Sequence, residues 1–192
     1  MNVFYLHPEP VTCAQMHCDT HASKMCVEYA QLLSTAHRVL DGELWYGRTT
    51  NGRKIARYLH PDTELQQVFY LASHINHPSN QWVRASEGNY TWMYDMWTAL
   101  CSEYQYRYGR VHESFRKLEY ALLIPPANIK CSKFFQPTPA MGNRPECIVE
   151  GDSLQSYRNY YWSDKRPIAK WTKREAPKWW KELELDEQRQ QA

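Results

Sequence analysis

The stretch at positions 18–31, CDTHASKMCVEYAQ, brings together side chains that can do chemistry: two Cys, a Lys, a His, an Asp and a Glu. Apolar residues around it recur at helical spacing, and on a helix His21, Lys24 and Glu28 lie on one stripe that continues to Thr35. A solvated face usually carries interchangeable Lys and Glu, whereas this stripe has one acid beside a Lys and a His. A lone carboxylate in that setting suits stabilisation of positive charge or proton transfer. An ordinary solvated helix face is the alternative interpretation.

The cysteines in the same region raise the question of a metal site. Cys13, Cys18, His21 and Cys26 have the spacing C-x4-C-x2-H-x4-C, which resembles a reordered zinc knuckle. On a helix the four side chains point to about 0°, 140°, 80° and 220° around the axis. Because zinc needs ligands that converge tetrahedrally, we expect no metal here and no other cofactor. We expect all six cysteines to be free thiols, since their positions show no paired spacing: 13, 18, 26, 101, 131 and 147.

Length and composition indicate one domain, over residues 1–181 of a chain of 192. A hydrophobic content of 43% excludes a disordered chain. The sequence has no run of 18 apolar residues, which excludes a membrane span and a membrane partner. Its first residues, MNVFYLHP, lack the basic and apolar regions of a signal peptide. We therefore expect a cytoplasmic protein, in the host cytoplasm if phage-encoded.

The hydrophobic pattern predicts a mainly α fold, compact and helical, with a long first helix and a long central helix. The first half should contain a helix over 11–40 that stops at Asp41-Gly42, a loop with a short helix over 42–62, and a helix over 62–74 capped by Asp62 or Thr63. Beyond these we expect a helix over 80–108 that is capped by Ser79, can break at Gly88 and ends at Gly109, a shorter helix over 112–123, an irregular stretch to about Gly151, a last helix capped by Asp152, and an acidic, frayed end over 182–192. Regions 42–78 and 125–150 are insertions or irregular segments of this domain.

The central helix carries two charges on its apolar face. Glu103 and Arg107 are four residues apart, so they can form an ion pair. Charges on an inward face must be paired or hydrogen-bonded. One interpretation is a structural pair that ties this helix to the first. The other is that Arg107 faces a cleft and holds a phosphate or the Glu28 carboxylate.

The C-terminal region is rich in cations and aromatic rings. Residues 165–181, KRPIAKWTKREAPKWWK, carry seven Lys or Arg against one acid. Cations neutralise phosphates and flat rings stack on bases, so this composition is typical of a surface that holds nucleic acid, including an extruded base. The alternative is that the Trp rings pack on the core. Our candidate nucleic-acid contacts are Arg107, Lys170, Trp171, Lys173, Arg174, Lys178 and Trp179.

Three features, in this order along the chain, resemble a known family. They are Asp19-x-His21 with Glu28 seven residues after the His, an acid followed four residues later by Arg107 and then by Gly109, and a C-terminal region containing YRNYY and KREAPKWW. Together they look like the phage pyrimidine-dimer DNA glycosylases of the endonuclease V type, which are compact all-α proteins. The match touches less than half of the chain, which is also similar to a group of uncharacterised phage proteins.

The resemblance implies a DNA-repair chemistry. In that family the N-terminal α-amine attacks C1′ of the damaged nucleotide and forms an imine, and a Glu on the first helix assists base loss and β-elimination. An α-amine has a pKa of about 7.7–8.0, so a useful fraction is neutral and nucleophilic near neutral pH. By this resemblance Glu28 is the catalytic acid and Asp19 and His21 support it. Double-stranded DNA with an extruded base is the partner.

The chain also departs from that family. Relatives expose a small second residue after Met removal, but here that residue is Asn2. The nucleophile can be the Met1 amine, the Asn2 amine or Lys24, or it can be absent. Three functions therefore stay open: a DNA N-glycosylase with or without abasic-site lyase activity, a non-catalytic nucleic-acid-binding module, and a phage counter-defence protein on the same scaffold.

Overall fold

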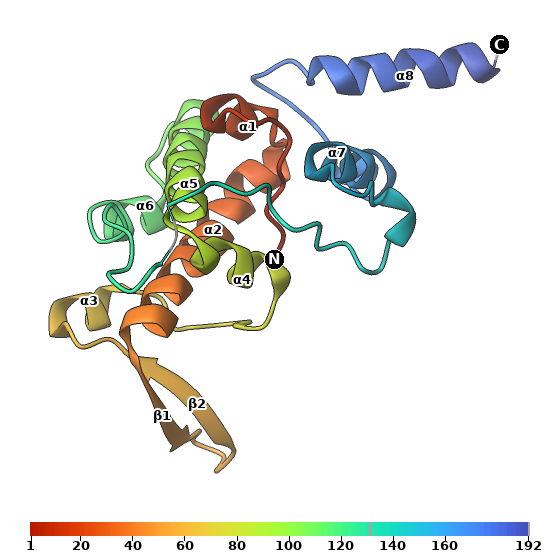
Figure 1. The fold of residues 1–192 in the computed structure, drawn as a ribbon. Helices are drawn as coiled ribbons and strands as arrows, with labels where there is room; N and C mark the ends of the chain where they lie inside the picture. Colours follow the sequence, from red (N-terminus) through yellow and green to blue (C-terminus); the bar gives the residue numbers. More distant parts are fainter. Residues whose placement is uncertain (131, 192) are drawn as a thin grey trace.

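The computed structural model describes residues 1–130 and 132–191, and it is mainly α, as predicted, with 55% of the chain in helices. In the described ranges no helix is long and apolar enough to cross a bilayer. Figure 1 shows α2 crossing the molecule diagonally, α5 beside it, a small hairpin at one end and α7 and α8 at the other. The elements are α1 (Pro10–Met16), α2 (Asp19–Asp41), β1 (Glu43–Arg48), β2 (Lys54–Leu59), α3 (Thr63–Val68), α4 (Pro78–Ala85), α5 (Glu87–Tyr108), α6 (Glu113–Leu118), α7 (Ser153–Asp164) and α8 (Lys178–Gln191), with short 3-10 turns at Pro145–Cys147 and Arg166–Ile168.

The predicted first helix is two helices, because the chain is extended at His17 and Cys18. Long-range bonds hold this break. The His17 ring contacts the Tyr29 hydroxyl at 2.8 Å, and the His17 carbonyl accepts from Arg107 at 2.8 Å. The Cys18 amide donates to the Tyr161 hydroxyl at 3.0 Å. These partners replace the bonds that a continuous helix would make, so tertiary contacts override the local periodicity.

Residues 42–62 correct a second prediction. Instead of a loop with a short helix, β1 and β2 form an antiparallel hairpin in which Trp45 faces Arg57. Its turn contains Asn51-Gly52, and Gly52 has φ of 79°, a conformation that glycine adopts without strain. Asn-Gly between two strand-like runs is the strongest short-range hairpin signal. The hairpin projects away from the helices (Figure 1).

The central helical region breaks near the predicted point. α4 ends at Ala85 and α5 begins at Glu87, and the Ser86 side chain caps α5 by accepting from the Asn89 amide. α4 is capped by the His77 ring rather than by Ser79, with Pro78 in the first turn. Gly109 ends α5 with φ of 71°, as predicted. α5 packs on α2, where the Trp97 indole donates to the Cys26 carbonyl at 2.8 Å.

The remaining helices differ from prediction mainly in length. Asp62 caps α3 and Asp152 caps α7, both as predicted, but α3 ends at Val68 and α6 at Leu118. The acidic end is helical rather than frayed, because α8 continues to Gln191. Arg166 in the preceding turn pairs with Glu187 and holds α8 in place, and within α8 the Trp180 indole donates to Glu184 at 2.9 Å.

The N-terminal segment is buried from its third residue onward, up to residue 6. Residues 3–6, VFYL, are at most 4% exposed. Phe4 stacks on the His21 ring at 4.3 Å between centroids and meets the Tyr161 ring edge-on at 5.4 Å. The Leu6 carbonyl accepts from Arg158 at 3.0 Å. This buried segment fixes the position of Met1 beside α2 and α4.

Candidate functional site

Glu28 lies between two amines. Its Oε2 is 3.7 Å from the Met1 nitrogen, and its Oε1 is 3.2 Å from Lys24 Nζ, one helical turn away on α2. The Glu28 side chain is 18% exposed, so it is neither on an open surface nor sealed inside. Two polar side chains of α4 hold Met1: Ser79 Oγ donates to its carbonyl at 3.2 Å, and Asn80 Nδ2 lies 3.5 Å from its sulfur. Position and charge at this carboxylate are therefore set by α2, α4 and the buried N-terminal segment.

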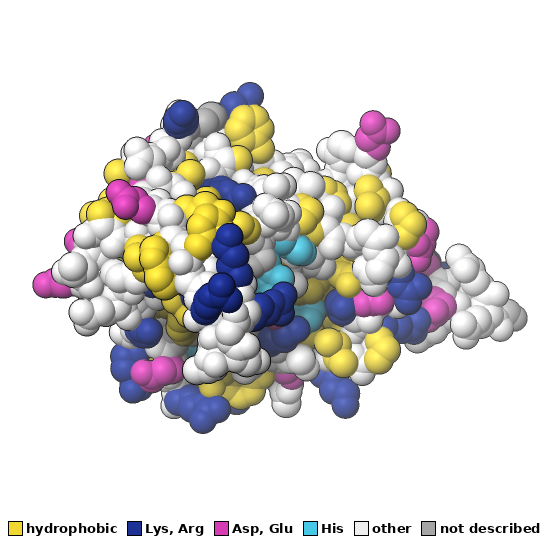
Figure 2. Space-filling view, turned by 90° about the horizontal axis from the view of Figure 1, so that it is seen from below, with side chains coloured by type: hydrophobic (Ala, Val, Ile, Leu, Met, Phe, Trp, Pro, Cys, Tyr) yellow, Lys and Arg dark blue, Asp and Glu magenta, His cyan; other side chains and the backbone are white. Residues whose placement is uncertain are grey.

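His77 adds an imidazole that our sequence analysis missed. Burial lowers its pKa, the positive charge of the nearby Met1 amine lowers it further, and the Glu28 carboxylate opposes both effects. Its Nδ1 accepts from the Ser79 amide at 3.2 Å, so the neutral ring carries its proton on Nε2. Figure 2 shows histidine side chains gathered near the centre of one face, with Lys and Arg side chains beside them. No spacing signal links position 77 to position 28, because helix packing alone brings them together.

His21 and Asn2 have different environments from those expected. The His21 ring is 4% exposed, bonds the Tyr161 hydroxyl at 2.8 Å and stacks on Phe4. Burial, followed by the positive charges nearby, lowers the pKa of His21 to about 3. The neutral, buried His21 ring therefore packs against Phe4 of the N-terminal segment and does not exchange protons with Glu28. Asn2 is half-buried next to Met1.

The two histidines at the helix break predict a strong acid sensitivity. Burial lowers the pKa of His17 to about 4 and that of His21 to about 3, against 6.5 when the chain is unfolded. Between these values the unfolded chain binds more protons, so the stabilisation is complete above pH 6.5 and is lost as the pH falls toward 3–4. We expect the two histidines to lower the free energy of unfolding in urea by roughly 5 kcal/mol from pH 7 to about pH 4.5. His21→Gln should make that decline shallower, and equal slopes would contradict the assignment.

Asp19 and Arg107 form a structural clamp, which corrects their expected roles. Arg107 Nη1 lies 3.0 Å from Asp19 Oδ1, and Thr172 donates its amide to the other Asp19 oxygen at 2.9 Å. Asp19 and Glu28 are nine residues apart on α2, which is about 13 Å along the axis. Asp19 therefore anchors the C-terminal segment and does not support the Glu28 carboxylate.

The Arg107 guanidinium is buried, with its side chain 2% exposed. It donates to Glu103 Oε1 at 2.7 Å and to the carbonyls of His17 and Gln15 at 2.8 and 3.0 Å. Burial raises the pKa of Glu103, but hydrogen bonds from Arg174 and Arg107 outweigh it and hold the pKa below its ordinary value. Arg107 thus pairs with Glu103 on α5 and with Asp19 on α2, which is the predicted structural link between the two long helices. It does not face a cleft that could receive a phosphate.

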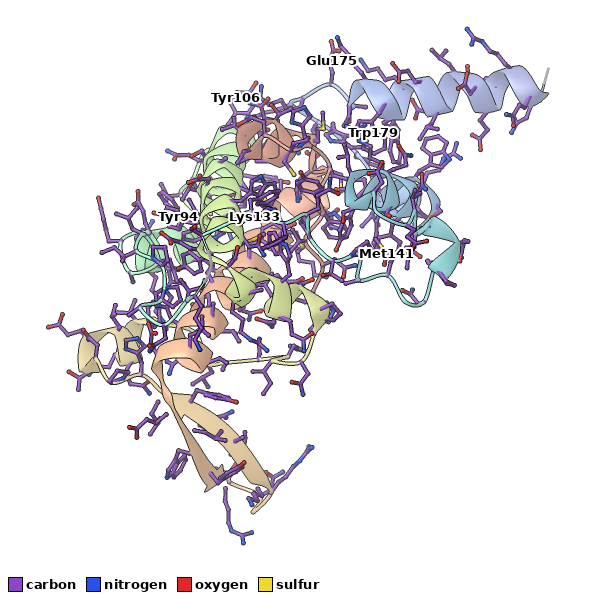
Figure 3. All side chains as sticks on the ribbon, in the orientation of Figure 1. Tyr94, Tyr106, Lys133, Met141, Glu175 and Trp179 are labelled. Carbon is purple, nitrogen blue, oxygen red and sulfur yellow. The ribbon has the colours of Figure 1, made fainter. Side chains whose placement is uncertain are left out.

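The C-terminal rings pack inward, which is the alternative interpretation of their sequence. Trp179 is 9% exposed and lies between α7 and α8 (Figure 3), edge-on to the Tyr161 ring. Trp171 is half-buried and its indole donates to the Met16 carbonyl at 3.1 Å. Arg174 pairs with Glu103 at 2.8 Å. Trp179 and Arg174 are therefore not free to contact nucleic acid as the sequence analysis expected. The exposed residues among the candidate nucleic-acid contacts of this region are Lys170, Lys173 and Lys178.

A groove of about 470 Å³ runs beside Lys24, between the first turns of α2 and the end of α5. Tyr104 and Tyr108 form one wall, and the Tyr108 hydroxyl donates to the Asp19 carbonyl at 2.8 Å. Arg110 donates to the Tyr104 hydroxyl at 2.8 Å. The two tyrosines are four residues apart and so share a helix face, a signal that the sequence offered and that we did not use. Lys24 connects this groove to Glu28.

Two regions of the chain bring together residue types that can bind metals. The described part of the chain gives one group whose ligand atoms lie within 4.8 Å of one another, His37, Asp41 and His60, and the Cys13–Cys26 segment gives none. The His60 Nδ1 accepts from the Asp62 amide at 3.2 Å, so a neutral His60 carries its proton on Nε2 and has no free lone pair for a cation. We therefore assign no metal to this cluster. Five cysteines are free, and Cys131 lies outside the described residues.

The relationship to the endonuclease V type glycosylases, which three sequence features suggest, stays a prediction. Around Glu28 the structure places a primary amine and a lysine within 4 Å of one carboxylate. Comparison of the chain with protein-family models, with curated proteins and with solved structures finds no match.

Proposed function

We propose that this protein is a DNA N-glycosylase that acts on a damaged or modified base and has abasic-site lyase activity through an imine. One observation carries the proposal: the Met1 nitrogen lies 3.7 Å from the Glu28 carboxylate. A primary amine next to a carboxylate, both fixed by a buried segment, is the arrangement that this reaction needs. The resemblance to the endonuclease V type glycosylases supports the same chemistry.

The reaction begins at C1′ of the target nucleotide. The neutral Met1 amine forms a bond to C1′ as the bond to the base breaks, and the base leaves with the electron pair and takes up a proton. Glu28 stabilises the cationic sugar and moves that proton. Opening of the sugar ring gives an imine between Met1 and C1′. Loss of a proton from C2′ then expels the 3′ phosphate, and water hydrolyses the imine to release the amine.

Lys24 is the competing nucleophile, since its Nζ lies 3.2 Å from the same carboxylate. Its side chain is 64% exposed, whereas that of Met1 is 7% exposed and is held by α4. Preorganisation therefore favours Met1. In this mechanism Lys24 serves to hold the Glu28 carboxylate in place and to attract a phosphate.

Borohydride trapping tests the proposal. Borohydride reduces an imine to a stable amine, so we expect a covalent adduct with duplex DNA that contains an abasic site, and mass mapping should place it on the residue-1 nitrogen. The same spectra establish whether the purified chain begins at Met1. Lys24→Gln is the matched control and should still give the adduct. Mapping of the adduct to Lys24 would reassign the nucleophile, and no adduct with no base release across several lesions would remove the enzyme proposal.

A further inference from the structure

The hairpin of residues 43–59, called the ribbon, projects from the helices (Figure 1), and none of its residues is buried. It carries four cations, Arg48, Arg53, Lys54 and Arg57, against one acid, Glu43. The whole chain has a net charge of only +2, so this short segment holds a concentrated positive charge. Such a charge disfavours pairing with a second copy of the ribbon and favours a polyanion.

The ribbon also exposes large apolar side chains. Leu44, Trp45 and Tyr46 are 48%, 52% and 57% exposed. A two-stranded sheet is marginally stable alone, and such adjacent apolar residues on a surface mark a binding site. The side chains alternate across the ribbon, so Trp45 and Tyr46 present a ring on each face.

Each ring is held in place by a neighbour. The Trp45 indole lies across Gly47, where a Cβ would come within 2.2 Å of the ring, so glycine is what lets the indole lie on its own strand. On the other face, Lys54 Nζ lies 4.5 Å from the centroid of the Tyr46 ring. Flat, positioned rings beside cations are typical of surfaces on which nucleic-acid bases and sugars pack.

The base of the ribbon is rigid because Arg38 anchors it. Arg38 is 1% exposed and donates to the carbonyls of Tyr58, Phe69 and Tyr70 at 3.0, 2.9 and 2.6 Å. Tyr58 belongs to β2, so this guanidinium fixes the ribbon to α2 and to the segment after α3. The ribbon therefore projects in one direction and does not swing freely.

We propose that the ribbon enters a groove of duplex DNA next to the nucleotide that Glu28 processes. The major groove admits a two-stranded ribbon, and the cations then lie against the phosphates on both sides. The choice of DNA rests on the proposed function. The end of α2 at Asp41 is 13 residues from Glu28, or roughly 20 Å along the helix, which corresponds to about six base pairs. The ribbon thus extends the contact to one side of the lesion.

The test compares two variants with the same loss of charge. Arg48→Gln, Arg53→Gln and Lys54→Gln together remove three exposed ribbon cations, whereas Lys117→Gln, Lys130→Gln and Arg189→Gln remove three exposed cations elsewhere. The ligand is a duplex of about 25 base pairs, a length set by the experiment, with an abasic-site analogue at its centre. Fluorescence polarisation measures its affinity for each variant at a series of salt concentrations. We expect the ribbon variant to bind at least about tenfold more weakly, with a salt slope smaller by about 2–3. The control variant should stay within about threefold of the parent.

Two further arms sharpen the outcome. A duplex cut to about four base pairs on one side of the lesion should bind the parent as weakly as the ribbon variant binds the full duplex, while the same cut on the other side should not. Trp45→Ala should weaken binding without changing the salt slope, because it removes a ring and no charge. Equal affinities of the ribbon and control variants would overturn the proposal, as would a ribbon variant that alters self-association in light scattering and leaves DNA affinity unchanged. The ribbon test measures DNA affinity, whereas the test of the glycosylase proposal with Glu28→Gln measures base release. Failure of one proposal can therefore be distinguished from failure of the other.

Discussion

Glu28→Gln should lower the rate of base release by about 10²–10⁴-fold, the usual contribution of a positioned acid or base. The amide keeps the shape of the carboxylate but removes the negative charge that lies 3.7 Å from Met1 and 3.2 Å from Lys24. It can neither stabilise the cationic sugar nor carry a proton to the leaving base. Single-turnover release of the base from a lesion-containing duplex measures the effect, with borohydride trapping as the second readout.

Binding separates this result from a folding defect. Glu28 is partly exposed, and Glu28→Gln removes no cation that could contact a phosphate, so this variant should retain the affinity for duplex DNA and the melting temperature of the parent. Glu182→Gln, an exposed change of the same chemistry on α8, is the matched control and should retain the parent rate. Should the parent bind DNA yet show no turnover on any lesion, the non-catalytic binding module becomes the better description. An active Glu28→Gln protein would mean that another group supplies the acid.

Arg107→Met should destabilise the protein by about 3–5 kcal/mol, since it removes one partner from a buried ion pair. The Glu103 side chain is 3% exposed and would keep only the partly exposed Arg174 as a partner. The carbonyls of His17 and Gln15 would also lose donors inside the structure. Urea unfolding measures the loss. Arg116→Met, which breaks an ion pair between side chains 67% and 76% exposed, should cost less than about 1 kcal/mol.

A double substitution checks the cause of that loss. Arg107→Met combined with Glu103→Met should recover part of the stability, because the buried Glu103 carboxylate no longer stays behind without Arg107. Arg107→Lys keeps the charge but cannot reproduce the fork of donors, so it should fall between the parent and Arg107→Met. If Arg107 instead held a DNA phosphate, Arg107→Lys would weaken binding at unchanged stability, and the clamp assignment would be wrong.

Three of the helix boundaries could be predicted from local sequence signals. Gly109, Asp62 and Asp152 each act through contacts within a few residues, and all three stand where the sequence placed them. The break at His17 was not predictable, because it depends on Tyr29 and Arg107, which approach from distant parts of the chain. The hairpin was predictable from Asn51-Gly52, and our error was to treat that pair as a loop signal.

The candidate site shows the same division. Glu28 and Lys24 were found from helical spacing, which places them on one face before any tertiary contact forms. His77 could not be found in this way, since its position depends on the packing of α4 against α2. Composition alone also could not say whether Trp179 faces solvent or packs against Tyr161. In residues 165–181 the sequence suggested one surface of cations and rings. In the fold Lys170, Lys173 and Lys178 are exposed, whereas Trp179 and Trp180 are buried.

The buried N-terminal segment has a consequence for biosynthesis and for handling the protein. Phe4 and Leu6 are synthesised long before their partners Tyr161 and Arg158, since Leu6 and Arg158 are 152 residues apart. At translation rates of 5–20 residues per second, the opening residues wait on the order of ten seconds for the surface that receives them. During that interval a nascent-chain chaperone has access to them. An affinity tag is better fused behind α8, because a fusion at Met1 would convert the amine beside Glu28 into an amide and occupy the space next to that carboxylate.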